Sequence, residues 1–159
     1  MKKNNNHVKE YFSQASIIAS LIDKSKIESL VKELAKIKKK SGRLFFLGVG
    51  GSAGNSSHAV NDFRKLCGIE SYTPTDNVSE LTARINDEGW SVSFSDWLKV
   101  SKLNKNDAIF IFSVGGGNKK KNVSTNLITA IQYAKKVKAR IFGIVGRKDG
   151  YTNMYGNKV

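Results

Sequence analysis

Apolar residues recur at two spacings along the chain, and the alternation between them predicts the order of its elements. Almost wholly apolar runs at residues 43–48, 108–114 and 140–145 are too short for helices and are typical of buried strands. The stretch 69–73 predicts a further short strand. Apolar residues at helical spacing predict helices around these strands, at 8–23, 25–41, 56–67, 77–85, 91–102 and 124–137.

Strands that alternate with helices and are apolar on both faces are typical of a parallel sheet covered on each side. The sequence therefore predicts an α/β fold, a three-layer αβα sandwich with a flavodoxin-like parallel sheet. Its length suits one domain, with the α/β core in residues 42–159. The two helices in residues 1–41 predict an N-terminal helical hairpin before that core. The final residues, 151–159, show no pattern of a closing element.

The net charge of +14 suggests a nucleic-acid ligand, because clustered cations release counterions from a polyanion. Only five of the 27 basic residues are arginines, the side chain that forks onto phosphates and bases. We therefore interpret the charge as a solvated, lysine-rich surface, and nucleic-acid binding is the weakest hypothesis. Such a surface is also compatible with a small anionic ligand.

Three features bear on where the protein acts. No apolar run approaches the roughly 20 residues needed to span a membrane. The start, MKKNNNHVKE, lacks the apolar segment of a secretory signal. Cys67 is the only cysteine and cannot form an internal disulfide, which fits a reducing cytoplasm. We expect a cytoplasmic protein with no membrane partner.

Two strands end in turns of small residues, GVGGSAGNS at 48–56 and SVGGGN at 113–118, and each turn is expected to open a helix. Ligands of open parallel sheets bind at the carboxyl ends of the strands. There, glycines let the backbone approach the ligand closely, and helix N-termini attract anions. Ordinary turns are the alternative. The first turn matches neither common nucleotide motif. The candidate substrate-binding residues are Gly50, Gly51, Ser52, Asn86, Asp87, Ser113, Gly115, Gly116 and Asn118.

His58 and Asp62 are four residues apart in the helix that follows the first turn, so they share one helix face. A carboxylate there could shuttle a proton at the carbon end of a small sugar phosphate. The pair could instead form half of a metal site, for zinc or a related ion. A surface histidine and aspartate that share a hydrogen bond are the third interpretation.

Two stretches carry a family resemblance: LGVGGSAGNSSHAVNDF at 47–63, and 110–152, which runs from FIFSVGGGN to GRKDGYT. They resemble the SIS (sugar isomerase) domain and, within it, the phosphoheptose isomerase branch. The resemblance implies an isomerase that converts sedoheptulose 7-phosphate to a heptose 7-phosphate through an enediol. Its product would feed synthesis of bacterial surface polysaccharide, such as lipopolysaccharide or capsule.

The resemblance also implies roles for individual residues. Ser52 and Ser113 match phosphate-binding serines. His58 matches a histidine that ligates zinc in some members, and Asp62 falls on a glutamate that is catalytic base and second metal ligand. Family members are similar in being homotetramers with active sites shared between subunits, so the N-terminal helices are expected to lie in an assembly core.

This sequence departs from the family pattern at several positions. Val49 replaces a loop asparagine, and Val114 and Gly115 stand where hydroxyl residues are expected. The second turn must therefore bind phosphate mainly through backbone N–H groups. Asp62 is one methylene shorter than the glutamate it replaces. These departures support an alternative function, a non-catalytic SIS module that binds a sugar phosphate or a protein partner in regulation.

A further departure concerns the C-terminus. In the family, a fifth strand and a long helix that carries a glutamine and a catalytic histidine follow about where Val159 stands. We interpret residues 1–159 as a C-terminally incomplete SIS domain, because an open sheet without its last strand and covering helix would expose an apolar edge. A naturally short and inactive form is the alternative.

Overall fold

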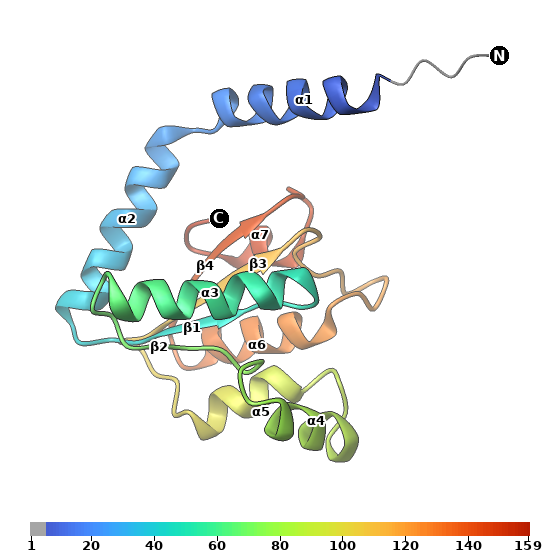
Figure 1. The fold of residues 1–159 in the computed structure, drawn as a ribbon. Coiled ribbons are helices and arrows are strands. Elements are labelled where there is room, and N and C mark those ends of the chain that lie inside the picture. The colour runs from blue at the N-terminus through green and yellow to red at the C-terminus, as the bar shows by residue number, and fades with distance from the viewer. Residues whose placement is uncertain (1–5) are drawn as a thin grey trace.

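The sheet consists of four parallel strands in the order β2, β1, β3, β4 (Figure 1). The computed structural model describes residues 6–159, and its strands are β1 (Leu44–Leu47), β2 (Ser71–Tyr72), β3 (Ala108–Ser113) and β4 (Arg140–Val145). β1 and β3 are direct neighbours, paired from Leu44 opposite Ala108 to Leu47 opposite Ile111. This strand order follows the flavodoxin-like pattern, so the predicted sheet is confirmed.

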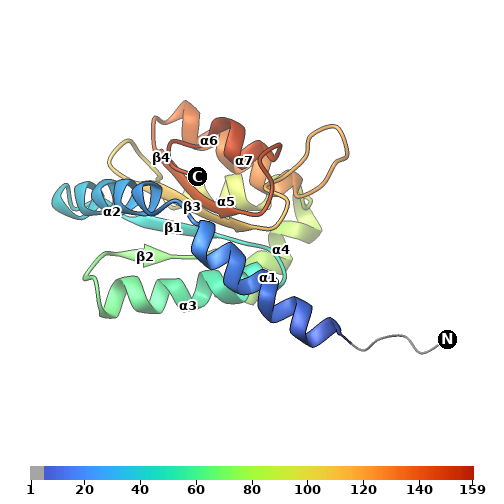
Figure 2. The ribbon, with the colours of Figure 1, turned by 90° about the horizontal axis from the view of Figure 1, so that it is seen from above.

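Helices cover both faces of the sheet because its strands are apolar on both sides. Successive strand residues point to opposite faces, so Phe45 and Phe46, both buried, belong to two different cores. On one face lie α2 (Lys24–Lys39) and α3 (Gly51–Lys65); the other face is covered chiefly by α5 (Ser93–Val100) and α6 (Thr125–Lys136). Figure 2 shows α3 and α6 on opposite sides of the sheet. The three-layer sandwich is thereby confirmed.

The remaining helix of the core region, α4 (Val78–Asp87), begins after Asn77, whose side chain accepts the N–H of Glu80. α4 contacts α5, and Leu81 packs on the edge of the core. α4 follows the short strand β2 and corresponds to the helix predicted at 77–85, and α5 corresponds to the helix predicted at 91–102. The order of elements therefore agrees with the sequence pattern from β1 through β4.

The N-terminal helices form where they are predicted, but they do not make a hairpin. α1 (His7–Leu21) has no buried residue, and Figure 1 shows it leading away from the sheet and from α2. The two helices are joined through Ile22 and Asp23, whose ψ angles of 127° and 101° are extended. Among residues 6–159, nothing buries the apolar side chains of α1, and Leu21 is 77% exposed.

The C-terminal residues do form a closing element, contrary to the sequence-based expectation. A short helix, α7 (Tyr151–Tyr155), packs against α6 and β4. After it, Lys158 forms a parallel bridge with Phe142, so the sheet gains a contact on the outer side of β4. A five-residue helix has too few positions to show an apolar period, which is why the pattern missed it. In the part of the chain from residue 6 onward, no helix is long and apolar enough to cross a bilayer.

Candidate functional site

Two glycine-rich turns lie next to each other at the carboxyl edge of the sheet. The first turn (residues 48–52) follows β1, and the second turn (residues 113–117) follows β3. Because β1 and β3 are paired along Leu44–Leu47, the turns are neighbours, as the sequence predicts. An anion at this edge can therefore be approached by both turns at once.

The first turn leads directly into α3, five residues earlier than the helix predicted at 56. Gly50 is its N-cap, with φ of +60° and ψ of −126°, a backbone conformation that favours glycine. The N–H groups of Ser52 and Ala53 bond back to Val49 and Gly50. Within residues 6–159, the N–H groups of Gly50 and Gly51 have no hydrogen-bond partner. They are free donors at a helix N-terminus.

Gly48 explains how closely this turn packs. A Cβ at position 48 would lie 2.2 Å from the carbonyl oxygen of Ser52 and 2.8 Å from Ser56 Oγ. Only a residue without a side chain lets the helix begin this close to the end of β1. The Ser52 side chain is half-buried, and its hydroxyl makes no hydrogen bond to any described residue, so it is available to a ligand.

The second turn is shaped by glycines and by one serine. Gly116 and Gly117 have φ of +67° and +83°. Ser113 Oγ accepts a hydrogen bond from the Gly116 N–H at 3.0 Å, which leaves its own proton free to be donated. Among the described residues, the N–H groups of Gly115 and Gly117 have no partner. The second turn therefore offers one hydroxyl and backbone donors, as its lack of other hydroxyl residues predicts.

The second turn is followed by a loop before its helix, and α6 begins one residue after the helix start predicted at 124. A small loop separates it from α6, closed by hydrogen bonds in both directions between Asn118 and Val123. The Asn118 side chain accepts the Lys121 N–H at 3.0 Å, so this candidate substrate-binding residue shapes its own loop. Ser124, just before α6, has a left-handed backbone and no capping hydrogen bond from its side chain.

Sequence reasoning missed a set of residues that support the second turn. The N–H groups of Tyr151 and Thr152, at the start of α7, donate to the carbonyls of Gly117 and Gly116 at 2.9 and 2.8 Å. Gly150 lies so close that a Cβ there would be 2.4 Å from the Gly115 carbonyl oxygen. The dipeptide GY followed by a buried threonine carries no local signal of this contact. It arises from the fold.

His58 and Asp62 meet on α3 as their spacing predicts. Their Nε2 and Oδ2 atoms are 3.2 Å apart, and the side chains are 76% and 42% exposed. Asp62 also accepts a hydrogen bond from Asn61 at 3.2 Å. The carboxylate is therefore oriented by neutral or cationic donors while it stays accessible to a ligand.

Residues 6–159 do not by themselves complete a zinc site. In the described range, no group of three or more His, Cys, Asp or Glu side chains is close enough to hold a metal ion. His58 and Asp62 supply two ligands, whereas catalytic zinc sites take three from protein. No step proposed below uses a metal.

Asn86 and Asp87 lie at the end of α4, where the Asn86 amide donates to the Asp87 carboxylate at 2.8 Å. Their side chains make no hydrogen bond to either glycine turn in the described chain. Another carboxylate does contact α3: Asp76, in the loop after β2, accepts a hydrogen bond from Ser57 at 2.5 Å. This contact fixes the loop beside the helix residue that precedes His58.

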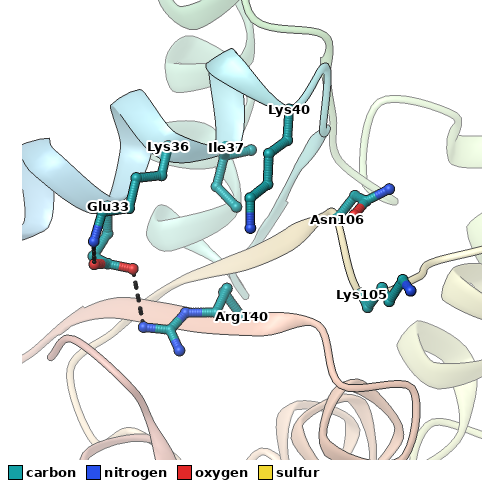
Figure 3. Close-up of a pocket in the computed structure, with 7 residues that line it drawn as sticks. All are labelled: Glu33, Lys36, Ile37, Lys40, Lys105, Asn106 and Arg140. Carbon is teal, nitrogen blue, oxygen red and sulfur yellow. Dashed lines mark hydrogen bonds and ion pairs between the residues drawn. The ribbon is translucent and has the colours of Figure 1, made fainter.

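A pocket of about 310 Å³ lies at the opposite, amino edge of the sheet, where Glu33 sits between Lys36 and Arg140 (Figure 3). The Glu33 carboxylate is 2.7 Å from Lys36 Nζ and 3.0 Å from Arg140 Nη2. The hydrogen bond from Lys36 lowers the pKa of Glu33, against the effect of desolvation. The carboxylate of Glu33 is thus paired with both Lys36 and Arg140. None of the residues that line the pocket carries a hydroxyl group, unlike the two turns with Ser52 and Ser113.

Curated relatives resemble nearly the whole chain. Phosphoheptose isomerase of Aliarcobacter butzleri is 26% identical over 153 residues, which cover 92% of this chain and 77% of the relative. Phosphoheptose isomerase 2 of Campylobacter jejuni is 26% identical over 163 residues, which cover 96% of this chain and 78% of the relative. Over nearly its whole length the chain is therefore similar to SIS-domain phosphoheptose isomerases.

The fold of this chain agrees with that of a solved structure. A phosphoheptose isomerase from Francisella tularensis superposes with a TM-score of 0.81 at 21% identity, covering 98% of this chain and 82% of that one. At such low identity the likeness concerns the fold. No family model matches the sequence.

Proposed function

We propose that this chain is a sugar-phosphate isomerase that interconverts sedoheptulose 7-phosphate and a heptose 7-phosphate. The observation that carries the proposal is the pair of neighbouring turns with free N–H groups and the Ser52 and Ser113 hydroxyls. These donors suit the oxygens of a phosphate. The product would enter the synthesis of bacterial surface polysaccharide, and the single Cys67 fits a cytoplasmic site of action.

In the reaction, the Asp62 carboxylate would take a proton from the carbon beside the ketose carbonyl, which gives an enediolate. The hydroxyl proton on that carbon would then pass to the former carbonyl oxygen, which is the enediol stage, and Asp62 would return its proton to the former carbonyl carbon to give the aldose, so atoms and charge balance. His58, 3.2 Å from Asp62, would orient the carboxylate. General base catalysis of this kind contributes about 10²- to 10⁴-fold to a rate.

The length of α3 restricts the substrate. Asp62 follows Ser52 by ten residues, so its Cα lies about 15 Å further along the helix. A phosphate at the turns and a reacting carbon at Asp62 need a long, open-chain sugar, or an Asp62 from a second copy of the chain. Where both turns and Asp62 belong to the same copy, this length supports a seven-carbon substrate over a short one.

We also propose that copies of the chain associate through α1, as the family resemblance to homotetramers suggests. Val8, Phe12 and Ile18 on this helix are each more than 60% exposed, with values of 66%, 65% and 63%. Burial of such side chains is worth about 1.5–3 kcal/mol each. Replacing Phe12 and Ile18 by glutamate should lower the mass measured by light scattering, whereas an unchanged mass would contradict this interface.

To test the isomerase, the chain and its Asp62→Asn variant are incubated with sedoheptulose 7-phosphate and the aldose product is followed. The variant should lose at least about 10²-fold in rate while it still binds the sugar phosphate. Equal turnover by both proteins would remove Asp62 from the mechanism. Binding without turnover by the unaltered chain would favour the non-catalytic sugar-phosphate-binding module.

A further inference from the structure

The carbonyl of Gly116, in the second turn, accepts two hydrogen bonds from one residue. Both the N–H and the Oγ1 hydroxyl of Thr152 donate to it at 2.8 Å, across 36 positions of sequence. Thr152 is fully buried. A carbonyl oxygen has two lone pairs, so this arrangement uses its whole capacity.

The direction of this carbonyl fixes the direction of a neighbouring donor. No peptide bond in the described chain is cis, and in a planar trans peptide the C=O and the following N–H point opposite ways. With the Gly116 carbonyl turned toward α7, the Gly117 N–H points away from α7. Gly117 is buried, and its N–H has no partner among the described residues. A buried unpaired donor costs free energy until an acceptor reaches it.

The residues around Thr152 explain why its side chain cannot rotate to another orientation without losing packing contacts. Its Cγ2 methyl faces β4, 3.0 Å from where a Cβ on Gly143 would stand. On the next peptide, the Tyr151 N–H fixes the Gly117 carbonyl at 2.9 Å. The second turn is thus held at two successive carbonyls, and the threonine methyl fills the space behind one of them.

We propose that Thr152 is a positioning residue for phosphate binding: its double hydrogen bond to Gly116 aims the Gly117 N–H at the phosphate oxygens. This inference rests on the proposed function, because it concerns the same anion site. It adds Gly117, which the sequence pattern did not single out, to the donors of the second turn. It also gives α7 a role in affinity that does not require α7 to contact the ligand.

The test compares three variants by titration with inorganic phosphate, monitored by ¹H–¹⁵N NMR of the full chain. Thr152→Val removes only the hydroxyl and should weaken phosphate binding about 3- to 10-fold. Thr152→Ser keeps the hydroxyl and should stay within about 2-fold of the unaltered chain. Ser71→Ala is the matched control, because Ser71 is also fully buried and donates to a backbone carbonyl, that of Ile69 at 2.9 Å. It should change affinity less than about 2-fold.

The Gly117 amide signal gives a readout that a merely structural role would not move. Phosphate should shift it in the unaltered chain and in Thr152→Ser, and shift it less in Thr152→Val. A Gly117 signal that phosphate leaves in place, in a chain that does bind phosphate, overturns the inference without any variant. Equal phosphate affinity of Thr152→Val and the unaltered chain overturns it as well. Failure of the unaltered chain to bind phosphate at all would instead overturn the proposed function.

Discussion

The two glycine turns face the same edge of the sheet but are built in different ways. In the first turn, the supporting hydrogen bonds come from the turn itself, as Ser52 and Ala53 bond back to Val49 and Gly50. In the second turn, the carbonyls of Gly116 and Gly117 are held by α7, more than thirty residues further along the chain. A local turn forms with its helix, whereas the second turn forms only when the fold is complete.

Because of this difference, we expect the two turns to respond unequally to substitutions elsewhere in the chain. Substitutions that disturb α7 should alter the second turn and leave the first unchanged. Substitutions inside α3 should alter only the first turn. The two turns also differ in hydroxyl use, because Ser113 already accepts a protein hydrogen bond and Ser52 makes none in the described structure.

The largest effect is expected from Gly150→Ala. The new Cβ would lie 2.4 Å from the Gly115 carbonyl oxygen and 3.1 Å from the Gly116 Cα, so the second turn must shift. Overpacking of this kind costs about 1–3 kcal/mol of unfolding free energy. Phosphate affinity should fall with it. Urea denaturation and phosphate titration measure the two effects.

The matched control is Gly54→Ala on α3, where an added Cβ meets nothing within 4 Å and the backbone is helical. Alanine should raise helix stability by up to about 1 kcal/mol there. If Gly150→Ala were as stable as Gly54→Ala and bound phosphate as well as the unaltered chain, the second turn would not depend on α7.

Much of the fold and of the site at the two turns could be predicted from the sequence. The rest could not, for physical reasons. The runs at 44–47 and 108–113 become neighbouring parallel strands because only burial on both faces suits their composition. His58 and Asp62 meet because spacing within one helix fixes their geometry. The support from Thr152 could not be predicted, since a contact across 36 positions leaves no local pattern. The predicted hairpin of α1 and α2 fails because spacing shows that a face is apolar, not what covers it.

The next largest effect separates the two serines. Ser113→Ala should lower the unfolding free energy by about 1 kcal/mol, because the Gly116 N–H loses its acceptor at 3.0 Å. Ser52→Ala should leave stability unchanged, since its hydroxyl bonds to no described residue. Both should weaken phosphate binding. Thermal denaturation of both variants, without and with phosphate, measures this expected difference in stability. Equal stability losses in the two variants would refute it.

A smaller effect is expected from the lysines beside the second turn. Replacing Lys119, Lys120 and Lys121 by glutamine removes three charges from the loop between the turn and α6. Phosphate affinity should fall a few-fold at low salt and the difference should shrink near 0.15 M salt, where charges are screened beyond about 8 Å. The triple replacement of Lys38, Lys39 and Lys40, at the end of α2, is the control. An equal loss from the control would show that only net charge matters.

The smallest effect concerns the opposite edge of the sheet. The Lys36 hydrogen bond, with the charge of Arg140, lowers the pKa of Glu33, so the ionised form stabilises the fold. This contribution is present above the ordinary pKa of about 4.3 and is lost as pH falls through the lowered value. Glu33→Gln should therefore be less stable at pH 7, by up to about 1 kcal/mol, and no less stable in strong acid. A stability difference independent of pH would contradict this, and phosphate binding should not change.

The most direct test of the account is a crystal structure of the chain with sedoheptulose 7-phosphate bound. We predict the phosphate between the first and second turns, within hydrogen-bond distance of Ser52, Ser113 and the Gly117 N–H, and an Asp62 carboxylate facing the carbons beside the carbonyl. A phosphate bound elsewhere, such as in the pocket at Glu33 and Arg140, or a sugar with no Asp62 near its reacting carbons, would contradict the account.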